Sequence, residues 1–164
     1  MINLGDFTYE QLTEYMVNKG EAKFRAKQVF SLLAKGCEDI DSLTTLSKSF
    51  REKLKEEAEV YIPVIEQKLT SKLDGTVKYL LRLSDGNVIE TVAMRYHHGI
   101  SVCVSSQVGC AMGCTFCAST LNGRVRNLMP HEITGQVLRV MKDLGERVGS
   151  VVVMGIGEIG RAHV

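Results

Sequence analysis

The sequence predicts a mixed α+β chain, in which a helical module and a β-hairpin ribbon precede the first βαβ unit of a partial (β/α) barrel. Three observations support this prediction. Apolar residues at helical spacing fill much of residues 1–60, strand-like runs between turn signals occupy residues 61–99, and a strand, loop, helix, strand order follows over residues 100–158. We therefore divide the chain into a helical accessory module, the start of a barrel, and a β ribbon that links the two.

The accessory module contains three predicted helices. Thr8 is a suitable N-cap for a helix that Gly20 ends, a second helix lies within residues 21–35, and a third follows Leu46 to about Ala58. Lysines and arginines dot these helices, but glutamates offset them. A solvated helix face accounts for this pattern more simply than a dedicated RNA surface, and both interpretations stay open.

The ribbon begins where the apolar period changes, near Tyr61. Three strand-like runs occupy residues 64–69, 77–83 and 88–94. Turn signals separate them at residues 73–75 and 84–87. This alternation predicts an antiparallel ribbon, with residues 96–99 as its joint to the next module. His97 and His98 fall at that joint, where exposed turn residues are the simpler interpretation.

The last module has the order of a βαβ unit. Ile100, Val102 and Val104 predict a short strand, Pro130 opens a helix that runs to about Leu144, and residues 150–154 form an apolar run typical of a strand buried on both faces of a parallel sheet. In α/β barrels the chemistry collects at the C-terminal ends of the strands. A cysteine-rich stretch and the segment Gly155-Ile156-Gly157-Glu158 both fall there.

The cysteine-rich stretch has the spacing Cys110-x3-Cys114-x2-Cys117. Three thiols cannot pair evenly, and without a signal peptide they indicate ligands of a metal or cluster. Three thiolates can hold a 4Fe-4S cluster and leave one iron for a non-protein ligand, for which S-adenosylmethionine is the natural candidate. Phe116 would shield such a cluster from water. Two alternatives stay open, a zinc knuckle with Cys103 as its fourth ligand and a set of buried free cysteines.

Several motifs in order carry a resemblance to the RlmN/Cfr family of radical S-adenosylmethionine RNA adenine methyltransferases. The match runs from the first helices to Gly157. Its motifs are Phe24-Arg25-Ala26-Lys27-Gln28, Leu46-Ser47-Lys48, Ser71 to Gly75, Glu90-Thr91-Val92, Cys103-Val-Ser-Ser-Gln-Val-Gly-Cys110, the cysteine loop, Ala118-Ser119-Thr120, Arg126-Asn127-Leu128, and Glu132-Ile133 with Gln136-Val137. The number of separate motifs makes this resemblance specific.

The resemblance implies a chemistry and a set of site residues. Family members use a 4Fe-4S cluster, here on Cys110, Cys114 and Cys117, and S-adenosylmethionine, here with Phe116, Gly157 and Glu158 as cofactor-binding residues. They methylate carbon 2 of an adenosine in 23S rRNA and in tRNA, through a methylated cysteine late in the full-length chain and a covalent RNA–protein intermediate. Glu90 matches the general base, and Cys103 matches the thiol that releases product as a disulfide.

Each of these residues also fits an ordinary structural role. Without the resemblance, Glu90 is an outward-facing strand carboxylate of a common kind and Cys103 a packing residue. Arg124, Arg126 and Asn127 fit phosphate contacts or local loop contacts equally. At the level of function, the alternatives are a relative that methylates carbon 8 and confers antibiotic resistance, and a zinc-stabilised RNA-binding module.

Composition and charge limit the partners. The 164 residues carry a formal net charge of +1, so RNA binding must depend on local patches and shape. No apolar run approaches the length of a membrane span. We expect a cytoplasmic monomer with 23S rRNA and tRNA as partners, no membrane association, and a flavodoxin-like external electron donor.

Residues 159–164 depart from the family pattern, which continues with proline after Gly-x-Gly-Glu. One permissible back-translation of Ile159 to Val164 is the start of a common short-read sequencing adaptor, followed in frame by a stop codon. We therefore expect a C-terminally truncated chain with a non-native tail at 159–164, inactive by itself because the methylated cysteine and most of the barrel would be absent.

Overall fold

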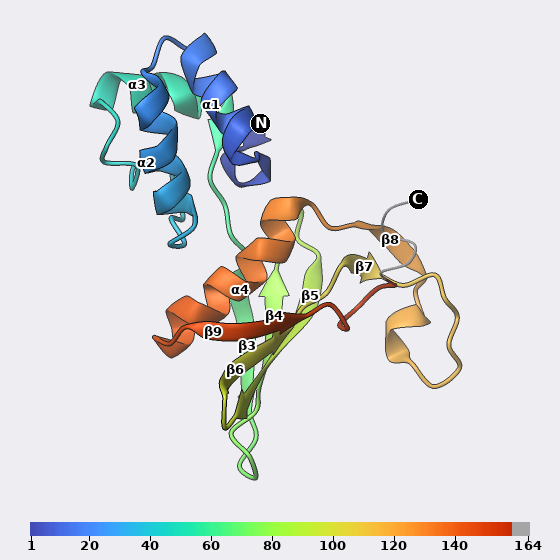
Figure 1. The fold of residues 1–164 in the computed structure, drawn as a ribbon. Coiled ribbons are helices and arrows are strands. Elements are labelled where there is room, and N and C mark those ends of the chain that lie inside the picture. Colours follow the sequence, from blue (N-terminus) through green and yellow to red (C-terminus); the bar gives the residue numbers. More distant parts are fainter. Residues whose placement is uncertain (159–164) are drawn as a thin grey trace. The chain divides into compact units, whose positions relative to one another are not determined.

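The computed structural model describes residues 1–158, which form two compact units, Met1–Ile62 and a second that begins at Pro63 (Figure 1). The predicted non-native tail at residues 159–164 lies outside the described residues. None of the helices within residues 1–158 combines the length and the apolarity that crossing a membrane requires.

The first unit is built from three α-helices, as predicted. A short parallel strand pair and a 3-10 turn complete it. The elements are β1 (Ile2–Asn3), the 3-10 turn η1 (Leu4–Asp6), α1 (Tyr9–Asn18), α2 (Lys23–Leu33), α3 (Lys48–Lys55) and β2 (Ala58–Glu59). Helix α1 begins at the predicted cap, because the Thr8 hydroxyl accepts from the Gln11 N–H at 3.2 Å and the Gln11 side chain accepts from the Thr8 N–H at 2.8 Å.

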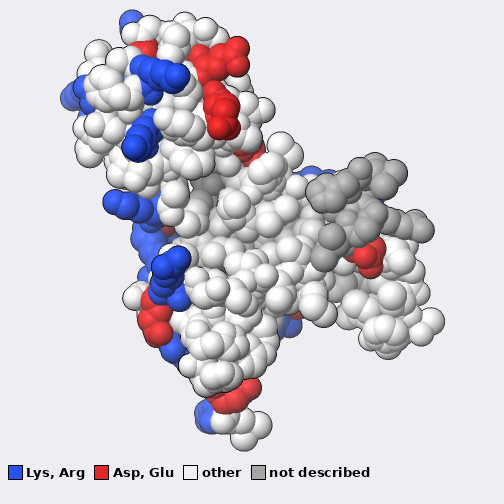
Figure 2. Space-filling model, viewed as in Figure 1, with Lys and Arg blue, Asp and Glu red and all other residues white. Residues whose placement is uncertain are grey.

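Helix amphipathicity explains the packing of the first unit. Its core side chains come from all three helices and from the segments that join them, and include Leu4, Leu12, Met16, Ala26, Val29, Leu43 and Leu54. The polar faces of the helices remain at the surface. Figure 2 shows both basic and acidic side chains on this unit, in keeping with the offset of charges in the sequence.

The second unit contains a five-stranded mixed sheet in the order β3-β4-β5-β6-β9. Pairs β3–β4, β4–β5 and β5–β6 are antiparallel, whereas β6 and β9 are parallel. The strands are β3 (Val64–Thr70), β4 (Val77–Arg82), β5 (Val88–Tyr96), β6 (Gly99–Cys103) and β9 (Val148–Val152). Helix α4 (Pro130–Leu144) joins the two parallel strands, which completes the predicted βαβ unit. The antiparallel ribbon and this unit are therefore parts of one sheet.

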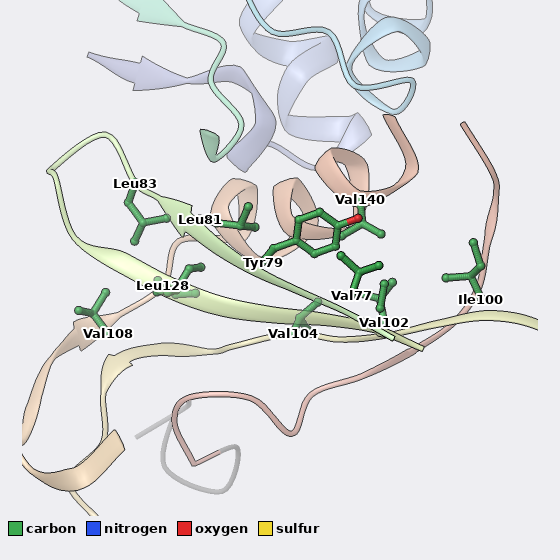
Figure 3. Packing of buried hydrophobic residues seen from close by; sticks show 12 residues of the cluster. Val77, Tyr79, Leu81, Leu83, Ile100, Val102, Val104, Val108, Leu128 and Val140 are labelled. Atoms are coloured by element: carbon green, nitrogen blue, oxygen red, sulfur yellow. The ribbon is translucent and has the colours of Figure 1, made fainter. Parts of the chain in front are cut away.

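Helix α4 packs on one face of this sheet. Inward-facing residues of the strands meet the apolar side of the helix, and Figure 3 shows several of them around Tyr79 and Val140. Tyr79 is fully buried, and its hydroxyl donates to the Asp143 carboxylate at 2.7 Å. Burial is the largest cause that raises the pKa of Tyr79, and the hydrogen bond to Asp143 adds to it.

The strand predicted at residues 150–154 differs from the observed one in position and burial. Strand β9 covers Val148–Val152, and its burial alternates, with Val151 47% exposed. The prediction of a strand buried on both faces was wrong for the described residues. There β9 is an edge strand that pairs only with β6, so it lacks the neighbouring strand and covering layer that full burial requires. The closed part of a barrel stays a prediction.

Candidate active site

Glu90 and Cys103 lie on the same face of the sheet. Val92 pairs directly with Cys103 across β5 and β6, so these two side chains share a face, and Glu90 follows on that face two residues away. Thr91 points to the other face, where its hydroxyl donates to Gln136 of α4 at 2.7 Å. The structure thus brings both residues predicted to be catalytic onto neighbouring strands, on the face opposite α4.

The Glu90 carboxylate forms an ion pair with Lys78 of β4. Oε1 lies 2.7 Å from Lys78 Nζ, and both side chains are close to half exposed, at 43% and 42%. Such an exposed pair contributes little stability. Its carboxylate is reachable from solvent, as a group that takes a proton from a large substrate must be.

The cysteine loop extends between two short strands. Strands β7 (Gln107–Gly109) and β8 (Arg124–Asn127) pair antiparallel, and the loop between them carries the three cysteines and the 3-10 turn η2 (Ala118–Thr120). Cys110 is buried at the root of the loop, whereas Cys114 and Cys117 are partly exposed. Their part of the loop is held by local bonds, such as Cys117 N–H to Cys114 O at 3.1 Å.

Phe116 projects from this loop into solvent. Its exposure is 91%, so it covers no protein group in the described structure. The predicted role of Phe116, the shielding of a cluster, depends on a bound cluster and stays a prediction.

The donor chemistry of the loop fits an iron–sulfur cluster, because Cys110, Cys114 and Cys117 are all free thiols of one loop. The side chains do not converge, however. Within residues 1–158 no group of three or more His, Cys, Asp or Glu side chains could hold a metal ion as placed, which applies equally to a zinc knuckle completed by Cys103. All five cysteines are free within this part of the chain. The predicted disulfide joins Cys103 to a cysteine late in the full-length chain, so it stays a prediction.

The glycine-rich segment that follows β9 lies against the residues that lead into the cysteine loop. The Gly155 N–H donates to Val104 O at 3.0 Å, and the Ile156 carbonyl accepts from Ser106 and Gln107 N–H at 2.9 and 3.1 Å. Gly157 and Glu158, the predicted cofactor residues, are thereby placed beside the root of the loop.

Two glycines of this segment are required by close approach. A Cβ atom at Gly155 would lie 2.7 Å from Ser105 Oγ and 2.8 Å from Val104 O, and one at Gly157 would lie 2.6 Å from Ser106 Oγ. Gly157 also has a φ of +117°, which favours glycine. Gly155 had no predicted role, although it lies two residues before Gly157 and packs against the same stretch of chain, Val104 to Gln107.

Arg126 and Glu132 connect the cysteine loop to α4. The two make a bidentate pair at 2.7 and 2.8 Å, and Glu132 is only 2% exposed. Arg126 also lies 2.7 Å from Asp85 in the β4–β5 turn. The hydrogen bonding of Arg126 to the Glu132 carboxylate is the largest cause that raises the pKa of Arg126, so its guanidinium stays charged. Of the phosphate contact and the local contact considered for Arg126, the structure supports the local one.

Gln136 is the second residue of α4 whose role the sequence did not indicate. It is fully buried, and its side-chain amide bonds both backbone groups of Ser105, accepting from N–H at 2.8 Å and donating to C=O at 3.0 Å. The only signal in the sequence was the Glu132-Ile133, Gln136-Val137 motif, whose spacing places the two polar residues one helical turn apart.

Known proteins resemble this chain over nearly its whole length. Residues 2–60 match the family model described as ribosomal RNA large subunit methyltransferase N-terminal domain. The chain is 50% identical over 157 residues to the probable dual-specificity RNA methyltransferase RlmN of Alkaliphilus oremlandii, covering 96% of this chain and 46% of that protein. It is 53% identical over 159 residues to the protein of the same name from Lachnospira eligens, covering 96% and 45%.

The chain is thus similar over 96% of its length to proteins named RlmN, and its residues 2–60 match the model of an rRNA methyltransferase N-terminal domain. The crystal structure of a radical SAM methyltransferase from Sphaerobacter thermophilus superposes on it with a TM-score of 0.85 at 36% identity, over 96% of this chain and 48% of that one. The chain therefore spans about half the length of the relatives that it matches. The resemblance seen in the sequence is confirmed, and its relatives are enzymes by name.

Proposed function

We propose that this chain carries the first half of the active site of an RlmN-type radical enzyme, which at the length of its relatives methylates carbon 2 of an adenosine in 23S rRNA and in tRNA. The observation that carries the proposal is the placement of Glu90 and Cys103 on one face of neighbouring strands. The glycine-rich segment and the root of the cysteine loop adjoin the end of the same strand β6.

Carbon 2 of adenine explains why such a site would need radical chemistry. It is an aromatic C–H carbon in an electron-poor ring, without an acidic proton or nucleophilic character, so polar methyl transfer from a sulfonium is not available. A 4Fe-4S cluster with S-adenosylmethionine supplies, when bound, the one-electron chemistry that such a carbon requires. Cys110, Cys114 and Cys117 are the residues that would hold the cluster, and Gly157 and Glu158 those that would bind the cofactor.

Glu90 and Cys103 take the two polar steps in this proposal. The Glu90 carboxylate, which pairs with Lys78 at 2.7 Å, accepts the proton from the adduct carbon. The Cys103 thiolate then attacks the sulfur of the cysteine that carried the methyl group. The S–S bond forms as the bond from that sulfur to the methylene carbon breaks, and the carbon keeps the electron pair and takes a proton to become the methyl group of the released RNA. The methylated cysteine, an external flavodoxin-like electron donor and a monomeric state belong to the proposal for the whole enzyme.

Anaerobic reconstitution of the chain, followed by iron, sulfide and zinc analysis, tests the cluster. We expect a coloured protein with about four irons and four sulfides per chain. A colourless protein that holds one zinc and no sulfide contradicts the proposal and supports a zinc-stabilised RNA-binding module. At the relatives' length, mass spectrometry of RNA fragments then distinguishes carbon 2 from carbon 8.

The predicted tail at residues 159–164 has its own test. The source gene is sequenced through and beyond the Gly157 codon. A frame that continues with Glu-Pro, further strand–helix units and a late cysteine supports the non-native tail, and a stop codon directly after Val164 in the gene contradicts it.

A further inference from the structure

We infer that Ser105 is a positioning residue that holds the strand of Glu90 and the glycine-rich segment Gly155–Glu158 in one fixed arrangement. The inference rests on the proposed function, which assigns proton transfer to Glu90 and cofactor binding to Gly157 and Glu158. It concerns how these elements, which come from separate parts of the sequence, are kept in register.

The β5–β6 ladder ends just before Ser105. The last pair is Val92 with Cys103, and a continued register would place Glu90 opposite Ser105. The backbone pairing does not continue to that position. Gln136 takes the place of the neighbouring strand, because its amide bonds both the N–H and the C=O of Ser105 at 2.8 and 3.0 Å. The backbone of Ser105 is thereby fully satisfied by a side chain of α4.

The hydroxyl of Ser105 makes the connection that the ladder no longer provides. It donates to the Glu90 carbonyl at 2.6 Å and accepts from the Ile156 N–H at 2.9 Å. Ser105 is completely buried, and its two partners are partly buried, so its hydroxyl is shielded from water. One oxygen therefore links the backbone of the proposed base to the backbone of the proposed cofactor segment.

The next two residues reinforce this arrangement on the same segment. Ser106 lies so close to Gly157 that a Cβ atom there would meet its Oγ at 2.6 Å. The Gln107 side chain accepts from the Glu158 N–H at 3.3 Å and donates to Asn127 Oδ1 at 2.9 Å, on β8 at the root of the cysteine loop. The Ser105-Ser106-Gln107 stretch thus contacts three parts of the proposed site, and Ser105 alone reaches Glu90.

Loss of the hydroxyl should release the glycine-rich segment without unfolding the sheet. In Ser105→Ala the Gln136 bonds to the backbone persist, because they do not involve the side chain. The Ile156 N–H and the Glu90 carbonyl lose a partner together. We expect the cofactor affinity to fall because the segment must then be ordered on binding.

Thr91→Val provides a matched control. The Thr91 hydroxyl is also fully buried and also bonds within this polar cluster, to Gln136 Oε1 at 2.7 Å. The substitution removes one buried hydroxyl of the same kind, yet touches neither Ile156 nor the Glu90 carbonyl. Both variants are compared with the unsubstituted 164-residue chain by amide hydrogen exchange and, after anaerobic reconstitution, by S-adenosylmethionine binding and iron content.

In Ser105→Ala we expect the Ile156 amide to exchange at least tenfold faster, while the Gly155 amide, which donates to Val104 O, keeps its protection. The dissociation constant for S-adenosylmethionine should rise about tenfold with iron content unchanged. Thr91→Val should leave the Ile156 amide and the dissociation constant within about twofold.

Three results would overturn the inference: an unchanged Ile156 amide, faster exchange that spreads evenly over β4 to β6, or faster Ile156 exchange with unchanged cofactor affinity. Failure of the proposed function looks different. If the unsubstituted chain binds neither cluster nor S-adenosylmethionine, the function fails, while the exchange pattern still decides whether Ser105 holds the two elements together.

Discussion

The cysteine loop and its root are held in different ways. Between Gly109 and Arg124 the loop relies on local bonds, with Phe116 and Leu121 exposed at 91% and 80%. At its root, by contrast, the buried side chains of Gln107 and Glu132, each 2% exposed, bond partly buried groups of β8 and of the glycine-rich segment. The residues at the two ends of the loop thus belong to a network of polar side-chain bonds, whereas the loop between them has mostly local bonds.

From this difference we expect protein contacts to fix the two ends of the loop and a bound cluster to order the part between them. A loop segment held mainly by local bonds loses further conformational entropy when a ligand orders it, and cluster ligation is strong enough to offset that loss. The root must exist beforehand, because it sets where the loop begins and ends. Substitutions in the loop and at the root should therefore affect different measured quantities.

Cys114→Ser tests the loop, where we expect a change in cluster binding and not in stability. We expect reconstituted iron to fall more than tenfold, because one of three protein ligands is lost. The apo chain should unfold within about 0.5 kcal/mol of the unsubstituted one, since Cys114 is partly exposed and packs in neither core. Cys37→Ser in the first unit is the control, with iron unchanged. Full iron in the Cys114 variant would remove Cys114 from the ligand set.

Arg126→Ala tests the other region, because it removes the ion pair with Glu132 at the root of the loop. The change leaves the Glu132 carboxylate, which is 2% exposed, without its charged partner, and we expect a loss of about 3–5 kcal/mol. Amide exchange in β4 and β5 measures it, because the chain divides into two units and the second must be followed by itself.

The double variant Arg126→Met with Glu132→Met sharpens this test. It removes both charges, so the loss should be smaller than for Arg126→Ala alone, although Met129 N–H also loses its partner on Glu132 at 2.8 Å. A double variant that is no more stable than the single one would mean that the buried carboxylate is not the source of the effect.

Gln136→Leu should have the next largest effect. It leaves the buried N–H and C=O of Ser105 unpaired, which we expect to cost about 2–3 kcal/mol and to expose the Ser105 amide selectively to exchange. Val140→Ala, on the same helix and fully buried, is the control of similar size. Its loss should spread over the unit, and selective exposure of Ser105 in that variant would contradict the role of Gln136.

Local patterns explain what the sequence could predict. The Thr8 cap, the Pro130 helix start and the three ribbon strands depend on residues close together in the chain, and the structure confirms all of them. The cysteine loop was equally visible because its three cysteines lie within eight residues of one another. Glu90 and Cys103 came from the resemblance, and the strand pairing explains how they share one face of the sheet.

Contacts between distant residues could not be predicted in this way. Gln136 meets Ser105 across 31 positions, and Ser105 meets Ile156 across 51. The position of β9 was displaced for a similar reason: its register on β6 includes an irregularity near Ser101, so apolar content alone did not show where pairing begins.

Asp143→Asn should have the smallest effect, at the end of α4 that does not touch the loop. The Asp143 carboxylate accepts from Lys68 and from Tyr79, which ties the helix to β3 and β4. Burial acts to raise its pKa, but the hydrogen bonds from Lys68 and Tyr79 outweigh it, so the pKa of Asp143 is lowered from its ordinary 3.8. A lowered pKa contributes stability that is present above pH 3.8 and is lost as the pH falls through the lower folded value.

We therefore expect Asp143→Asn to reduce the stability of the second unit by about 1 kcal/mol at pH 7 and by progressively less below about pH 4, measured by exchange or urea unfolding at each pH. Tyr79→Phe removes one of the two donors to Asp143, so the pH dependence of its stability should lie between that of the unsubstituted chain and that of Asp143→Asn. Iron content and S-adenosylmethionine affinity should not change in either variant, because both lie at the far end of α4 from Gln136. A difference that is equal at about pH 7 and about pH 3 would show that packing, and not the charge of Asp143, holds this end of the helix.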